Sequence, residues 1–270
     1  MKITFVGGGN MGSALISGLI RNGADRKDIS VIEPDPERRE KMKAEYGISV
    51  FESVDLLDCD LILLAVKPQQ LFGVASALAD KLSSQIVVSI AAGILTSDLS
   101  RWLKGYGRII RVMPNTPAQV MKGISALYAM PQVSAQDRRM AEEVLSSVGS
   151  TIWLIDEGKM DAFTALCGSG PAYVFYFLEA LIEAGTEMGF DAIDAKKMAL
   201  ETFSGAVALA SESQDEPGIL RKKVTSKGGT TERALLEMEN SSVKEHVVQA
   251  IRAAEERSKE LGIELGKTSC

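Results

Sequence analysis

A glycine-rich turn near the N-terminus constrains the fold of this chain more than any other feature. It reads Gly7-Gly8-Gly9-Asn10-Met11-Gly12, directly after the apolar run from Lys2 to Val6. The pattern G-x-G-x-x-G between a predicted strand and a predicted helix is typical of dinucleotide binding. Gly7 allows the tight turn, Gly9 lets a pyrophosphate approach the backbone, and Gly12 permits close packing of helix on strand. The N–H groups and dipole of the helix start favour an anion.

Up to about residue 155, short apolar runs alternate with amphipathic segments. The strands expected from this rhythm are 2–6, 29–33, 61–66, 86–90, 108–113 and 151–154, with a hairpin-like stretch at 125–129. The helices expected between them are 12–22, 36–46, 70–81, 96–103 and 136–147. Strands that alternate with helices predict βαβ units and a parallel sheet covered on both faces. Residues 1–155 are therefore predicted to form a doubly wound, Rossmann-type domain.

From residue 156 onward the strand signal disappears, and 156–270 is predicted to be an all-helical domain. Apolar residues recur at helical spacing in five segments, which are 160–188, 192–211, 218–224, 231–238 and 243–261. The string Gly168-Ser-Gly-Pro171 should kink or restart the first helix. A helical segment of this size has limited material for a core of its own. We expect it to pack against a second copy, so that the protein is a homodimer or a larger homo-oligomer.

Composition excludes several classes of function. The net charge is −6 and basic residues are interleaved with acidic ones, which argues against a nucleic-acid partner. The most continuous apolar run, Leu61 to Val66, is too short to span a membrane, and the N-terminus does not read as a signal peptide. The three cysteines (Cys59, Cys167, Cys270) suggest neither a disulfide framework nor a metal site. The single histidine, His246, reads as a helix-surface residue and rules out a multi-histidine metal centre. We expect a cytoplasmic protein without a metal.

Further turns are expected to line the cofactor, because ligands of such sheets bind beyond the carboxyl ends of the strands. Glu33 ends the second strand, where an acid accepts the hydroxyls of the adenosine ribose. A carboxylate there repels a 2′-phosphate and so favours NADH, whereas Arg38 or Arg39 would hold the phosphate of NADPH. The predicted cofactor is therefore NADH or NADPH. Besides Val6 to Gly12 and Glu33, the predicted cofactor-binding residues are Ala65, Val66, Lys67, Pro68, Ala91, Ala92, Gly93, Met113, Pro114 and Asn115.

Six strings together resemble the pyrroline-5-carboxylate reductase family over essentially the whole chain. They are FVGGGNMG, LAVKPQ, VSIAAG, RVMPNTP, the GSGPAYVF stretch at 168–175, and LRKKVTSKGGTTERAL at 220–235. The first occurs in many dehydrogenases, whereas the last two are much more specific. The resemblance implies a dinucleotide-binding domain followed by a helical dimerisation domain. It also implies NAD(P)H-dependent reduction of the C=N bond of 1-pyrroline-5-carboxylate to L-proline.

The resemblance places the substrate in the turn from Ser226 to Thr231. Ser226 and the N–H groups of Gly229, Thr230 and Thr231 would hold the substrate carboxylate, as successive N–H groups at a helix start do. Gly228 of the same turn is also a predicted substrate-binding residue. The Thr231 hydroxyl would contact the ring nitrogen, which makes Thr231 and Ser226 the predicted catalytic residues. Glu157 matches a further position that faces the substrate. The family usually has Ser-Pro-Gly-Gly in this turn, whereas this chain has Lys227 in place of the proline.

Two other functions remain open at this point. A hydroxy-acid dehydrogenase of the 3-hydroxyisobutyrate type also joins a glycine turn to a helical domain, but it needs a lysine as acid and base. Lys159 and Lys196 are available, although neither lies in a suitable turn. The second alternative is a sensor that binds NAD(P)H without turnover. An imine nitrogen is basic enough to arrive protonated, so a site without histidine is chemically coherent for imine reduction.

Overall fold

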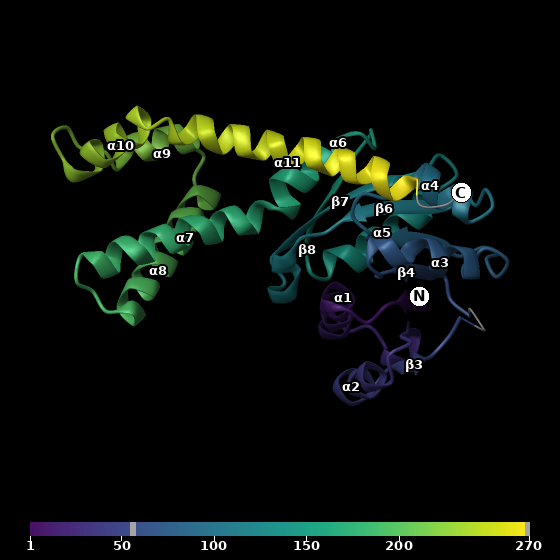
Figure 1. Cartoon of the computed structure of the whole chain (residues 1–270). Coiled ribbons are helices and arrows are strands. Elements are labelled where there is room, and N and C mark those ends of the chain that lie inside the picture. The colour runs from purple at the N-terminus through teal and green to yellow at the C-terminus, as the bar shows by residue number, and fades with distance from the viewer. Residues whose placement is uncertain (55–57, 268–270) are drawn as a thin grey trace. The chain divides into compact units, whose positions relative to one another are not determined.

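The computed structural model describes residues 1–54 and 58–267, and its contacts divide the chain into two compact units (Figure 1). The first unit comprises Met1–Ser169 together with the C-terminal segment Ala254–Cys270, and the second comprises Gly170–Ala253. This division differs from the predicted boundary after residue 155. Met160 and Phe163 are buried against Ala126, so the segment after 155 belongs to the core of the first unit. Cys270 lies outside the described residues.

One sheet of eight strands forms the centre of the first unit, in the order β3-β2-β1-β4-β5-β6-β7-β8. The strands are β1 (Ile3–Val6), β2 (Ile29–Ile32), β3 (Ser49–Phe51), β4 (Leu61–Leu64), β5 (Ile86–Ser89), β6 (Ile109–Met113), β7 (Gly123–Ala129) and β8 (Gly149–Trp153). The first six strands pair in parallel, which confirms the doubly wound fold.

One strand refines the prediction and another was missed: the hairpin-like stretch expected at 125–129 belongs to β7. β7 runs antiparallel to β6, because only the short turn η2 (Thr116–Val120) joins them and a parallel pair needs a long crossover. The stretch at 125–129 thus belongs to a strand that extends the sheet. β3 was not predicted from the sequence. It has three residues at the edge of the sheet, two of them exposed, and is too short to show an alternating pattern.

Helices cover both faces of this sheet, because alternate strand residues point to opposite sides. The helices of the first unit are α1 (Asn10–Arg21), α2 (Pro36–Tyr46), α3 (Pro68–Leu78), α4 (Thr96–Trp102), α5 (Ala135–Ser146) and α6 (Lys159–Phe163), with the short turn η1 (Arg26–Asp28). Ile3 and Phe5 of β1 are buried in one cluster with α1, α2 and α5. Val6 is buried in a second cluster with α3 and α4. The first unit is therefore a three-layer structure.

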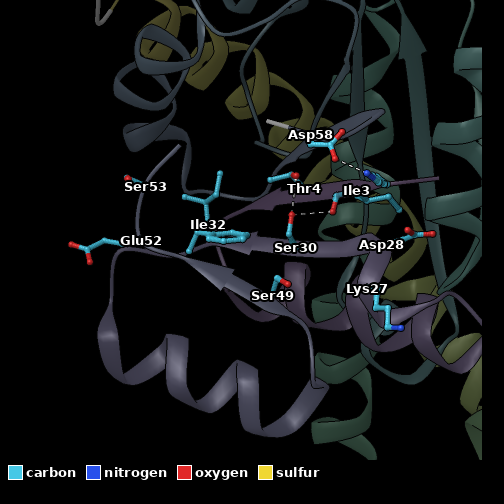
Figure 2. Close-up of a pocket in the computed structure, with 12 residues that line it drawn as sticks. Ile3, Thr4, Lys27, Asp28, Ser30, Ile32, Ser49, Glu52, Ser53 and Asp58 are labelled. Carbon is cyan, nitrogen blue, oxygen red and sulfur yellow. Dashed lines mark hydrogen bonds and ion pairs between the residues drawn. The ribbon is translucent and has the colours of Figure 1, made fainter. Parts of the chain in front are cut away.

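A hollow of about 470 Å³ lies over β1, β2 and β3 (Figure 2). Its polar groups largely satisfy one another. Thr4 Oγ1 and Ser30 Oγ are 2.9 Å apart, and Lys2 Nζ donates to Asp58. None of the predicted site residues lines this hollow, so it does not carry the predicted chemistry.

The second unit consists of helices joined by turns. It contains α7 (Gly170–Glu187), α8 (Ala192–Glu212), α9 (Pro217–Lys223) and α10 (Thr230–Asn240), and the first part of α11 (Val243–Gly266). His246 lies on α11 and is exposed, as predicted. α7 and α8 approach closely, since a Cβ placed on Gly185 would lie 3.1 Å from the Cβ of Ala195.

The predicted interruption at 168–171 is confirmed. The helical path first widens into a π-helical turn, η3 (Thr164–Gly168), and α7 begins only at Gly170. π-helical turns often mark functional sites.

The helices of the second unit leave many large apolar side chains exposed, among them Phe175, Tyr176, Met188, Ile193, Val207 and Leu209. α7 has no buried residue within this chain. Among the described residues, the stretch Lys159–Glu187 is long and apolar enough to cross a membrane by length and composition. The sequence predicted this stretch as the first of the five helical segments, 160–188, with an interruption at Gly168-Ser-Gly-Pro171. An apolar surface of this size requires a cover.

Candidate active site

The glycine turn after β1 has the geometry that each glycine predicts. Gly7 has φ +101°, and a Cβ there would lie 2.8 Å from the main-chain oxygen of Ala65. Gly12 packs so closely that a Cβ would lie 2.8 Å from the main-chain oxygen of Gly7. By contrast, nothing lies within 4 Å of a Cβ placed on Gly9. The turn is therefore tight at Gly7, closely packed at Gly12 and open at Gly9.

The open side of the turn coincides with the start of α1. Gly9 is the N-cap of this helix and makes no side-chain cap hydrogen bond. The first N–H groups of a helix have no intrahelical acceptor, so they are suited to an anion. A hollow of about 390 Å³ adjoins the turn and is lined by residues that include Gly8, Gly9, Asn10, Arg38 and Lys41. Open space over Gly9, an uncapped helix start and adjacent cations fit the pyrophosphate of a dinucleotide.

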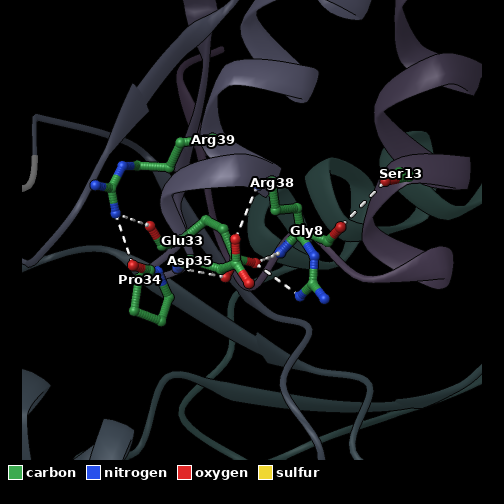
Figure 3. Close-up of polar contacts among 7 residues, drawn as sticks. All are labelled: Gly8, Ser13, Glu33, Pro34, Asp35, Arg38 and Arg39. Atoms are coloured by element: carbon green, nitrogen blue, oxygen red, sulfur yellow. Dashed lines mark hydrogen bonds and ion pairs between the residues drawn. The ribbon is translucent and has the colours of Figure 1, made fainter.

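Glu33 follows β2 and turns its carboxylate back toward the glycine turn (Figure 3). Its Oε2 accepts a hydrogen bond from Gly8 N at 2.9 Å, and its Oε1 accepts one from Asp35 N at 3.1 Å. The side chain is only 4% exposed, and Arg38 Nη1 lies 3.3 Å from Oε2. Glu33 thus fixes the conformation of the phosphate turn. Its predicted bond to the ribose remains a prediction.

Arg38 and Arg39 differ in what they contact. Arg39 Nη1 donates to the main-chain oxygens of Glu33 and Pro34, at 3.0 and 2.7 Å, which ties it to the loop after β2 (Figure 3). The Arg38 side chain is 50% exposed and lines the hollow beside the glycine turn. Of the two arginines proposed from the sequence to hold a 2′-phosphate, Arg38 is the more exposed one, and its contact with that phosphate remains a prediction.

Three other predicted cofactor segments follow the neighbouring strands β4, β5 and β6. Lys67 is the N-cap of α3, Gly93 has φ +79° after β5, and Met113 ends β6. Because these strands are parallel to β1 and adjacent in the sheet, their carboxyl ends meet at one edge. The structure therefore brings the predicted segments at 6–12, 65–68, 91–93 and 113–115 to the same edge of the sheet.

The predicted substrate turn lies in the second unit and opens α10. Gly228 has φ +76°, and Gly229 N donates to the main-chain oxygen of Ser226 at 3.1 Å. Gly229 is the N-cap and makes no side-chain cap bond, so Thr230 and Thr231 occupy the first two helical positions. Ser226 Oγ lies close over the turn, since a Cβ on Gly229 would be 2.6 Å from it. The hydroxyl, the glycines and the uncapped helix start are thus adjacent.

A residue not predicted from the sequence also takes part in this turn. Glu232 Oε2 accepts a hydrogen bond from Gly228 N at 2.7 Å. Glu232 is the third residue of α10, from which glutamates commonly reach back to N–H groups before the helix. That spacing is the sequence signal that would have found it. The predicted anion site therefore already holds one carboxylate on its Gly228 N–H group.

Glu157 lies in the first unit and has three polar partners there. Its carboxylate accepts hydrogen bonds from Thr96 N at 2.8 Å and from Thr96 Oγ1 at 2.7 Å. It also pairs with Arg111 Nη1 at 3.0 Å, where the Arg111 side chain is 4% exposed. Glu157 thus caps the start of α4 and neutralises a buried arginine of β6. The predicted contact of Glu157 with substrate remains a prediction.

No group of three or more potential metal ligands occurs in the part of the chain that the structure describes. Burial raises the pKa of the Cys167 thiol, which keeps it in the unreactive thiol form.

Comparison with known proteins extends over the whole chain. A family model described as pyrroline-5-carboxylate reductase dimerisation matches residues 157–261, and one described as NADP oxidoreductase, coenzyme F420-dependent, matches residues 2–93. The pyrroline-5-carboxylate reductase of Pseudomonas aeruginosa is 42% identical over 269 residues, which cover 98% of each chain.

Two solved structures agree with this match. The pyrroline-5-carboxylate reductase from Coxiella burnetii has a TM-score of 0.91 and 38% identity, over 96% of this chain and 98% of that one. A Plasmodium falciparum pyrroline carboxylate reductase with NADP bound has a TM-score of 0.88 and 31% identity, over 97% and 98% of the two chains. With its phosphate turn, its helical second unit and these full-length relatives, the chain belongs to the pyrroline-5-carboxylate reductase family.

Proposed function

We propose that this protein reduces the C=N bond of 1-pyrroline-5-carboxylate with NAD(P)H and forms L-proline. The observation that carries the proposal is a pair of glycine-containing turns, each opening a helix whose N-cap makes no side-chain bond. The first has the open space and adjacent cations that a dinucleotide needs. The second combines a hydroxyl pair with an anion-binding helix start. Full-length relatives with this activity support the same conclusion.

The chemistry that the bound dinucleotide supplies is the donation of hydride from its nicotinamide ring. The residues of the chain are left with binding and orientation. The N–H groups around Gly9 hold the pyrophosphate, and Ser226 with the N–H groups at the start of α10 holds the substrate carboxylate. The Thr231 hydroxyl orients the ring nitrogen, which arrives protonated. Reduction of such an imine neutralises a cation, so the chain needs no histidine acid, and catalysis consists of positioning.

Oxidation of NADH and NADPH by the purified protein tests this function. We expect turnover with pyrroline-5-carboxylate, slower turnover with piperideine carboxylate and, in a parallel assay with the oxidised dinucleotides, no reduction of NAD+ or NADP+ by β-hydroxy acids. Turnover of the hydroxy acids alone would favour the dehydrogenase alternative. Binding of the dinucleotide without turnover of any cyclic imine would favour the sensor.

For the cofactor preference, we propose that the chain uses both NADH and NADPH. The Glu33 carboxylate, which would repel a 2′-phosphate, is partly neutralised by Arg38 at 3.3 Å. The same guanidinium is half-exposed and available to the phosphate of NADPH. The kinetic constants for the two dinucleotides, measured side by side, test this. A ratio of kcat/KM above about a hundredfold in either direction would contradict dual use.

For the assembly, we propose a homo-oligomer in the cytoplasm, formed through the helical second unit. Residues 157–261 match a dimerisation family, and this region carries the exposed apolar residues of α7 and α8. These observations favour a second copy of the chain as the partner that packs on the apolar residues of α7 and α8. Static light scattering at micromolar concentration should give at least twice the mass of one chain. A lone monomer, or protein that is recovered only in detergent, would overturn the assembly.

A further inference from the structure

We propose that Asn115 is a positioning residue, which fixes the nicotinamide-side loop after β6 against the π-helical turn η3. From the sequence, Asn115 was predicted to contact the cofactor. In the structure its side-chain amide is hydrogen-bonded to other residues of the protein. This inference rests on the proposed function and assigns a role to one residue of that same site.

Asn115 uses both ends of its amide within the first unit. Its Oδ1 accepts a hydrogen bond from Ile124 N at 2.9 Å, which ties the loop to β7. Its Nδ2 donates to the main-chain oxygen of Cys167 at 3.2 Å, which ties the loop to η3. The residue is 8% exposed, so both bonds are sheltered from water. A buried amide with both ends paired holds its surroundings in one arrangement.

The Cys167 carbonyl lacks the donor that a continuous α-helix would give it. In an α-helix the carbonyl of residue i accepts from the N–H group of residue i+4. For Cys167 that residue is Pro171, which has no N–H group. The proline that restarts the helix therefore removes a donor, and Asn115 supplies one. In this way the strings RVMPNTP and GSGPAYVF are physically coupled.

Met113 makes a second contact across the same junction. A Cβ placed on Gly168 would lie 2.7 Å from Met113 Cε, so the two residues are in close contact. Met113 and Cys167 also pack around one apolar cluster, with Ala126, Met160 and Phe163 at its centre. The loop after β6 is thus held to η3 at Met113 and at Asn115. Met113 to Asn115 is also the segment predicted to line the cofactor, so its position should determine how the nicotinamide ring is presented.

The test is a double-mutant cycle between Asn115 and Pro171. Asn115→Ala should lower kcat about tenfold and raise the Kd for NADPH severalfold, because small displacements of positioning groups are costly in rate. Asn115→Asp keeps an acceptor for Ile124 N but loses the donor, so it should behave like Asn115→Ala. Pro171→Ala restores an N–H group at the right spacing. In the Asn115→Ala background it should recover melting temperature, because the Cys167 carbonyl regains a donor, but it should not recover kcat, because the loop after β6 stays untied from η3.

A matched control exists in the same unit. Asn22 Nδ2 donates to the main-chain oxygen of Ser147 at 3.2 Å, which is the same kind of bond at the same length. Asn22→Ala should lower the melting temperature slightly and leave kcat and the Kd for NADPH unchanged. If Asn115→Ala also changes only the melting temperature, the positioning role is wrong. Recovery of kcat by Pro171→Ala would likewise overturn it, because the rate would then depend on the pairing of the Cys167 carbonyl and not on the position of the loop.

Two safeguards keep the test decisive. If Asn115→Ala does not give folded protein, Asn115→Asp with and without Pro171→Ala carries the same comparison. If the wild-type protein binds NADPH but reduces no cyclic imine, the proposed function fails. The fluorescence-measured Kd for NADPH still decides the role of Asn115 in that case.

Discussion

The two glycine turns of this chain are built alike but supported differently. In each, a glutamate accepts a hydrogen bond from the second of the three turn positions before a helix. Glu33 binds Gly8 N at 2.9 Å, and Glu232 binds Gly228 N at 2.7 Å. Glu33 directly follows a neighbouring strand and is almost fully buried, whereas Glu232 comes from the helix that the turn itself opens.

This difference separates a preformed site from an adjustable one. The first turn is held by the packed sheet, because Gly7 N donates to Ile32 O and Gly8 N donates to Glu33, so its conformation is set before any ligand arrives. The second turn is held by its own helix, and an internal carboxylate occupies one N–H group that a substrate carboxylate would also favour. We therefore expect the first turn to tolerate little change and the second to respond to substrate. Four predictions test this contrast, from the largest effect to the smallest.

The largest effect should come from Gly7→Ala compared with Gly228→Ala. Both glycines have positive φ, but a Cβ on Gly7 would lie 2.8 Å from a main-chain oxygen, and one on Gly228 would meet nothing within 4 Å. Gly7→Ala should cost about 3 kcal/mol or more in the free energy of unfolding and abolish dinucleotide binding. Gly228→Ala should cost about 1–2 kcal/mol. Urea unfolding and NADPH fluorescence measure both, and equal costs would remove the contrast.

The next effect concerns the cation that accompanies the acid of the first turn. Arg38→Ala should lower kcat/KM for NADPH about tenfold and leave that for NADH within about twofold, because a half-exposed charge-assisted bond to phosphate is lost. Arg39→Ala is the control, since Arg39 bonds main-chain oxygens of the loop after β2. An equal fall for the two dinucleotides in Arg38→Ala would show that Arg38 only supports the turn.

Hydroxyl removal in the second turn should have a smaller effect. Thr231→Ala should mainly lower kcat, and Ser226→Ala should mainly raise the KM for the imine. The loss of one neutral hydrogen bond corresponds to about 0.5–1.5 kcal/mol in each case. Steady-state kinetics separates the two roles. Wild-type constants in both variants would contradict the placement of the substrate in this turn.

The smallest effect, and the most direct test of adjustability, is Glu232→Gln. The amide still accepts the bond from Gly228 N but no longer repels a substrate carboxylate. The KM for pyrroline-5-carboxylate should therefore fall about twofold to fourfold, with the KM for NADPH unchanged. The matched change Glu33→Gln in the first turn should weaken NADH binding instead. An unchanged or raised KM for the imine in Glu232→Gln would mean that Glu232 does not compete.

Much of the fold followed from local sequence. The strand and helix positions of the first unit, and the restart of the helix at Gly168-Ser-Gly-Pro171, depend on hydrophobic period and on proline chemistry. The edge strand Ser49–Phe51 did not, since three half-exposed residues carry no period. The antiparallel direction of β7 depends on how a short turn folds in three dimensions.

Within the candidate site, the sequence predicted where the two glycine turns lie but not which side chains pair around them. The glycine turns were visible because only certain residues fit a given backbone conformation. The pairing of Arg111 with Glu157 joins positions far apart in the sequence. The same holds for the bond from Asn115 to Cys167. The residue types at these positions do not predict the two pairs, because the pairs depend on how the strands of the sheet are assembled.

The position of the last helix limits how the chain can be divided into folded fragments. Its final turns lie against the loop after β5, where Gly262 and Gly93 approach so closely that a Cβ on Gly262 would be 3.1 Å from the Gly93 oxygen. Residues from 254 onward belong to the first unit, which contains the sheet, and not to the second unit. The helical unit is therefore an insert, and its host is discontinuous along the chain. No single cut can release an intact nucleotide-binding fragment, and such a fragment would need the end of α11 supplied in trans or by circular permutation.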